Sequence, residues 1–120
     1  MSRSITQNAN PFGAVLSENT ALGATPDDNI RGGATTVYQI CVDNSANSAV
    51  TYLQLFNNAA PTVGSTIPDC QFFVPATSKK TFTFDFTGLA FDTALSMACT
   101  TTAGGSTAPN SNTIVYGLMS

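Results

Sequence analysis

Alternation of apolar and polar residues is clearest over residues 81–86. Phe82, Phe84 and Phe86 alternate there with two threonines and an aspartate, which is the pattern of a strand with one buried face. Short apolar runs of similar length occur at residues 36–42, 50–56, 70–74, 94–100 and 113–119, and residues typical of turns separate them. The pattern predicts a body of six short strands.

Six strands that each have an apolar face need a second layer to cover that face. The sequence therefore predicts an all-β fold, an antiparallel β-sandwich of two packed sheets. Its topology is either jelly-roll or immunoglobulin-like. A jelly roll needs about eight strands, so the extra pair would come from the N-terminal segment or from the long loops.

Residues 1–33 differ from the rest of the chain because their apolar residues follow no sustained period. Turn signals interrupt them at residues 10–13, 25–29 and 32–33. We therefore predict an extended N-terminal arm at 1–33 and a β-sandwich body at 34–120. The arm either folds back on its own body or lies on a neighbouring chain, and its predicted partner-contact residues are Ile5, Phe12, Val15, Leu16 and Ile30.

Two of the predicted strands are apolar on both faces. In the last run, Ile114, Tyr116 and Leu118 share one face, which we assign to the core, and two further apolar residues lie on the other. The second faces need cover from the arm, a loop or another subunit. The candidate subunit-interface residues are Val50, Tyr52, Phe56, Val115 and Met119.

Charged residues make up only 9% of the 120 residues, against about 25% in an average soluble domain. A surface of short uncharged side chains loses little entropy and little charge solvation when a partner covers it. The net charge is −3, and the few basic residues form no stripe, so we expect no nucleic-acid binding. No apolar run has the length of a membrane span or of a signal-peptide core, which predicts no membrane association and synthesis in a cytoplasm.

The residue inventory offers little chemistry. The chain has no His, and its three cysteines cannot all pair within one chain. We expect buried thiols, no zinc site and no activated nucleophile. Asp27 and Asp28 follow a proline and should face water, and the oxygens of Asp43, Asn44, Asp69 and Asn112 should cap turns in preference to binding calcium. We therefore predict no enzymatic activity, no catalytic or metal-binding residues and no cofactor.

Four segments carry a family resemblance: VYQICVDNSAN (37–47), YLQLFNNAAPTVGSTIPD (52–69), GLAFDTALS (88–96) and CTTTAGGSTAP (99–109). Together they resemble a small β-sandwich domain of tailed-bacteriophage virion structural proteins. The resemblance covers residues 35–119 and not the arm. It rests on turn and loop motifs, so no functional residue can be transferred from the family.

The resemblance implies a non-enzymatic virion component, made in the bacterial cytoplasm and located in the virion. We expect a capsid cement or decoration protein, which binds the outer capsid surface and reinforces contacts between major capsid subunits. Its partners would be the major capsid protein and copies of itself, with a homotrimer as one option. The alternatives are a tail-fibre or receptor-binding module that recognises a host surface glycan, and a connector or baseplate component.

Overall fold

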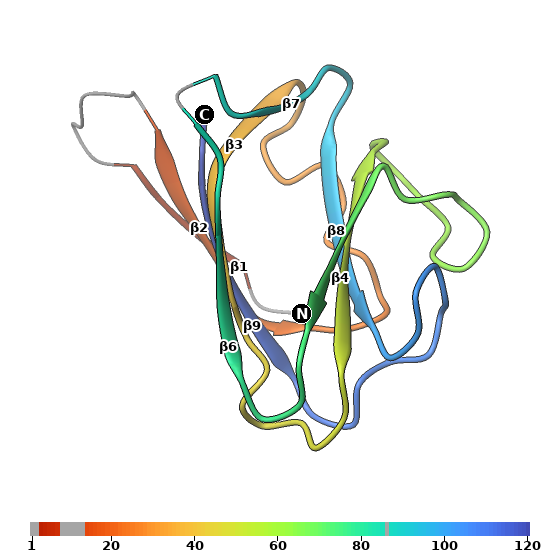
Figure 1. Ribbon diagram of the computed structural model, residues 1–120. Helices are drawn as coiled ribbons and strands as arrows, with labels where there is room; N and C mark the ends of the chain where they lie inside the picture. The colour runs from red at the N-terminus through yellow and green to blue at the C-terminus, as the bar shows by residue number, and fades with distance from the viewer. Residues whose placement is uncertain (1–2, 8–13, 86) are drawn as a thin grey trace.

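The computed structural model describes residues 3–7, 14–85 and 87–120. These residues form nine strands in two antiparallel sheets (Figure 1). In chain order the strands are β1 (Arg3–Gln7), β2 (Val15–Leu22), β3 (Thr35–Asp43), β4 (Thr51–Asn57), β5 (Cys70–Val74), β6 (Lys79–Thr83), β7 (Leu89–Phe91), β8 (Leu95–Thr100) and β9 (Thr113–Met119). The predicted all-β antiparallel sandwich is confirmed.

The larger sheet has six strands in the order β1-β2-β9-β3-β6, with β7 also paired to β3. The smaller sheet has the order β5-β4-β8. Apolar side chains from the inner faces of both sheets form one core, as binary patterning requires. The Phe-rich run contributes Phe82 and Phe84 to the edge of this core, where both pack against Phe72. Phe86 lies outside the described residues.

Strand β9 faces the core with the side opposite to the one predicted. Val115 and Met119 are fully buried, whereas Ile114, Tyr116 and Leu118 lie on the outer face and are half-buried. Alternation alone could not identify the inner face because both faces are apolar. The register identifies it, since Val115 lies beside Val42 of β3 and Met119 lies beside Val15 of β2.

The N-terminal segment is integrated into the sandwich and does not form a separate unit. Strand β2 lies between β1 and β9 in the larger sheet. Its inward residues include Ser17 and Asn19, both buried, so its buried face is partly polar and its sequence shows no clear alternation. The predicted boundary at residue 33 therefore does not divide the structure.

Residues 23–30 run from β2 across to the smaller sheet and cover the outer edge of β8. Asp27 N donates to Met97 O at 2.8 Å, and Met97 N donates to Asp27 O at 3.2 Å. Cys99 N also donates to Gly23 O at 2.9 Å. The segment thus supplies the backbone partners that an edge strand otherwise lacks.

Two long loops, residues 58–69 and 101–112, lie over the outer face of the smaller sheet (Figure 1). Ser96 Oγ donates to the backbone oxygen of Asn58, and Gln54 Nε2 donates to Gly105 O at 3.1 Å. The loops also touch each other, because a Cβ on Gly64 would lie 2.8 Å from the Cβ of Ser106. Loops therefore cover this face, and the N-terminal segment adds to the cover, because Asn29 N donates to the same Ser96 Oγ at 2.9 Å.

Candidate functional site

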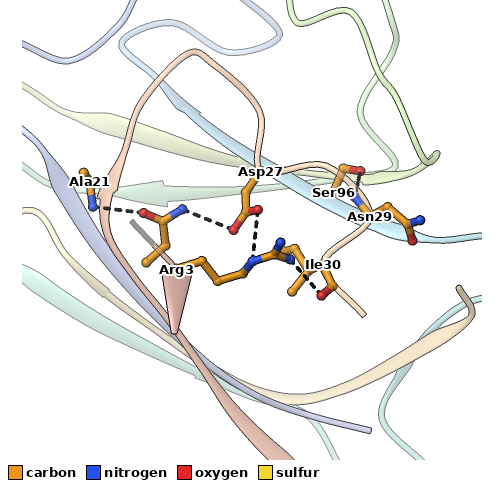
Figure 2. Close-up of polar contacts among 7 residues, drawn as sticks. Arg3, Ala21, Asp27, Asn29, Ile30 and Ser96 are labelled. Carbon is orange, nitrogen blue, oxygen red and sulfur yellow. Dashed lines mark hydrogen bonds and ion pairs between the residues drawn. The ribbon is translucent and has the colours of Figure 1, made fainter. Parts of the chain in front are cut away.

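A buried polar cluster joins β1 and β2 to the segment that covers β8 (Figure 2). The guanidinium of Arg3 reaches this segment twice: Nε lies 3.6 Å from Asp27 Oδ1, and Nη1 donates to Ile30 O at 2.8 Å. Asn19 Nδ2 donates to Asp27 Oδ2 at 3.2 Å, and Asn19 Oδ1 accepts from Ala21 N. Both carboxylate oxygens of Asp27 are therefore engaged.

The pair Asp27-Asp28 does not behave as predicted. Asp28 is exposed, but only 3% of Asp27 is accessible. Partial desolvation, followed by the negative charge of Asp27, raises the pKa of Asp28. Asp27 is buried because Arg3 supplies a neutralising charge and Asn19 supplies a hydrogen bond, the two conditions under which a carboxylate tolerates burial. The cluster therefore links the larger sheet to the segment that is bound along β8 of the smaller sheet.

A second polar network anchors the turn between β3 and β4. It centres on Asn44, which is fully buried. Its Nδ2 donates to Ala49 O at 3.1 Å and to Pro75 O at 3.0 Å. Its Oδ1 accepts from Asn47 Nδ2 at 2.9 Å and from Thr51 Oγ1 at 2.8 Å. One amide therefore links the turn to the end of β5 and to β4.

Two of the acidic residues weighed as calcium ligands accept hydrogen bonds from backbone amides. Asp43 caps a turn, as predicted, whereas Asp69 bonds an amide twelve residues earlier in the chain. Asp43 Oδ1 accepts from Ser45 N at 2.9 Å, and Asp69 Oδ2 accepts from Asn57 N at 2.6 Å. The hydrogen bonds from Ser45, together with the nearby charge of Lys79 at 3.7 Å, lower the pKa of Asp43. Within residues 3–7, 14–85 and 87–120, no group of three or more Cys, Asp or Glu side chains is placed to hold a metal ion.

All three cysteines carry free thiols. Cys99 is buried, and Cys41 and Cys70 are half-buried. Burial raises the pKa of Cys99 to about 12, and burial followed by the charge of Asp69 raises the pKa of Cys70. Both groups stay protonated near neutral pH, so neither is an activated nucleophile.

Several predicted contact residues lie inside the molecule. In the N-terminal segment Val15 and Ile30 are buried in the core of their own chain, and Phe12 lies outside the described residues. Ile5 and Leu16 are exposed, by 39% and 42%.

The candidate subunit-interface residues also divide into two groups. Phe56, Val115 and Met119 are buried within the chain, so they are corrected to core residues. Val50 and Tyr52 are half-buried. Phe56 lacks an exposed face because the loops cover the smaller sheet, and the two β9 residues face the core because of the register.

Of the apolar surface on the outer face of the larger sheet, the sequence predicted Leu16 and missed the three residues of β9. We call Ile114, Tyr116 and Leu118 the outer β9 row, and Leu16 extends the row because it pairs directly with Leu118. A hydrogen bond with the Glu18 carboxylate is the main cause that raises the pKa of Tyr116. The two-sided apolar character of residues 113–119 was the signal for this surface, although it was assigned to the wrong face.

The described part of the chain contains no helix that is long and apolar enough to cross a membrane. The fold and its polar networks define an all-β sandwich whose buried polar side chains brace loops and sheets. No protein family, curated protein or solved structure matches this chain.

Proposed function

We propose that this chain is a non-enzymatic virion structural protein that decorates a bacteriophage capsid. In this role it binds the outer capsid surface and reinforces contacts between major capsid subunits. The resemblance of residues 35–119 to small virion domains supports the virion assignment. The observation that carries the attachment role is the outer β9 row, an apolar stripe on the uncovered face of the larger sheet.

The outer β9 row offers a physical basis for attachment. Its apolar side chains gain about 25 cal/mol for each Å² that a partner removes from water. Around the row the same face presents the uncharged residues Gln39, Thr81 and Thr83. It also carries two carboxylates, Glu18 beside Tyr116 and Asp43 beside Ile114, which a partner would have to leave in water or pair. Many equivalent copies on one particle would convert modest individual contacts into stable decoration.

The hydrogen bonds of the aspartates support a structural role for the chain. The buried Asp27, the half-buried Asp43 and the exposed Asp69 each accept a hydrogen bond from another residue of the chain. These features favour a rigid building block, and they agree with the proposal.

Copy number tests the proposal against its rivals. Gel densitometry of purified virions should give an amount of this protein comparable with that of the major capsid protein. A copy number far below that of the capsid protein would instead indicate a tail fibre, connector or baseplate component.

A matched pair of variants tests the attachment surface. Leu118→Lys places a charge in the outer β9 row, whereas Ala108→Lys places one in an exposed loop over the other sheet. We expect Leu118→Lys to reduce binding to undecorated capsids at least tenfold and Ala108→Lys to retain it. Equal binding by the two variants would contradict the proposed surface.

A further inference from the structure

The outer strands of the two sheets differ in how well they are protected from pairing with another chain. In the smaller sheet, residues 23–30 cover the edge of β8. In the larger sheet, β1 carries Arg3 and β6 carries Lys79 and Lys80. Charged edge residues and covering segments are the usual means of blocking edge-to-edge association. Among the described residues, strand β5 (CQFFV) pairs with β4 alone and carries no charge, and the loop of residues 101–112 contacts it through the side chain of Gln71, which accepts from Gly104 N.

Exposed apolar side chains accompany this uncharged edge. Phe73 is 50% exposed, and its ring contacts that of Tyr52 edge-on with centroids 5.6 Å apart. Ile67, just before the strand, is 85% exposed. On the inner side of the sheet, Phe72 lies 4.7 Å from Phe82 between ring centroids. An added strand would therefore meet aromatic groups on both of its faces.

We propose that two copies of this chain pair through β5, antiparallel and about a twofold axis at Phe72. The two smaller sheets then form one continuous sheet. In this register Gln71 lies opposite Phe73 of the partner subunit, and Cys70 lies opposite the partner subunit's Val74. The β5 edge of each copy receives its missing backbone partners from an identical strand. Because β5 contains no charge, the pairing brings no like charges together.

Charge complementarity at the ends of the strand favours a second copy as the occupant. The same register places Asp69, which precedes β5, opposite the partner's Pro75. Asn44 bonds both Pro75 O and Ser78 O, so the start of β6 lies beside Pro75. Asp69 and Lys80 are both exposed. Each copy therefore brings its Asp69 towards Lys80 of the partner subunit, and the twofold axis repeats this contact.

Sedimentation velocity over a range of protein concentrations tests the pairing directly. The unmodified chain should form a dimer, and Phe73→Lys should raise the dissociation constant at least tenfold by placing a charge at the seam. Leu16→Lys is the matched control, because Leu16 is similarly exposed but lies on the larger sheet. Circular dichroism should show that both variants retain the β-fold. A monomer at all concentrations, a trimer, or equal effects of the two variants would overturn the proposal.

A charge exchange separates the contact from any structural role of Asp69 within its own chain. Asp69→Lys and Lys80→Asp should each weaken the dimer, and the double variant should restore it. Loss of the internal bond to Asn57 would not be rescued by a charge at position 80. A double variant no tighter than the single variants would count against the pairing. The measurement uses no particles, so failure here leaves the capsid proposal standing, and failure to bind capsids leaves the dimer standing.

Discussion

Arg3 and Asp27 form an ion pair that connects the N-terminal strand of the larger sheet to the segment bound along β8 of the smaller sheet, with Nε 3.6 Å from Oδ1. The Asp27 side chain is 4% exposed, and the Arg3 side chain is 34% exposed. The electrostatic attraction between Arg3 and Asp27 is therefore stronger than that of a fully exposed ion pair, but water still screens it in part. This pair adds to the pairing of β1 with β2 a side-chain link between the N-terminal strand and the segment on the smaller sheet.

Removing the carboxylate should weaken this tie. We expect Asp27→Ala to lower the free energy of unfolding by about 2 kcal/mol, because Arg3 and Asn19 lose their acceptor in a largely buried site. Urea unfolding at neutral pH measures the change. The control Asp28→Ala alters the exposed neighbour and should not lower the free energy of unfolding. Equal losses for the two variants would contradict a specific role for the pair.

Asn44→Ala should be among the most destabilising polar substitutions in the chain. It removes an amide that bonds two backbone oxygens and two side chains at a fully buried position. Leaving those groups unpaired should cost about 2–4 kcal/mol. Asn58→Ala removes one bond, to Ala60 N in an exposed turn, and should cost under about 1 kcal/mol. Thermal or urea unfolding compares the two, and a small loss for Asn44→Ala would refute the network's importance.

Two aspartates should affect the pH dependence of stability with opposite signs. Folding lowers the pKa of Asp43, so its contribution is present above the usual Asp pKa of about 4 and is lost as the pH falls through the folded value. Asp43→Asn should therefore destabilise the protein at neutral pH and have little effect in strong acid. Unfolding midpoints measured from pH 2 to pH 7 report this difference.

Folding raises the pKa of Asp28, which favours the protonated form. Its ionised carboxylate therefore reduces stability once the pH exceeds the folded pKa, and Asp28→Asn should stabilise the protein at neutral pH. The same pH series provides the measurement. If both Asn variants shifted stability in the same direction at pH 7, the assignment of opposite shifts would be wrong.

Contact between the two covering loops depends on a glycine. Gly64 has φ +94°, and a Cβ there would lie 2.8 Å from Ser106 Cβ. Gly64→Ala should lower the free energy of unfolding by about 2 kcal/mol, from backbone strain and displacement of the loops together. Gly104→Ala is the control, because its φ is +64° but no atom lies within 4 Å of the added Cβ. Adding Ser106→Gly should recover part of the loss, and differential scanning calorimetry measures all three.

The sequence predicted most strands of residues 34–120 because their inner faces are apolar. It placed the Phe-rich strand at residues 81–86, where the structure has β6 at Lys79–Thr83, and it did not count the short β7 among its six strands. It predicted β2 poorly because Ser17 and Asn19 lie on the inner face, where they remove the expected alternation. Their burial is possible only beside groups from other segments, such as Asp27 for Asn19. No local pattern contains that partner.

By itself the sequence determined the all-β class, the two-layer sandwich and the turn-capping role of Asp43, because these follow from side-chain alternation and from contacts between near neighbours. Tertiary structure decided which face of β9 is buried, how the N-terminal segment joins both sheets, and that loops cover Phe56. Local alternation cannot identify the buried face when both faces of a strand are apolar or when the buried face is polar. In these strands, the partners that long-range pairing brings together determine which side chains are removed from water.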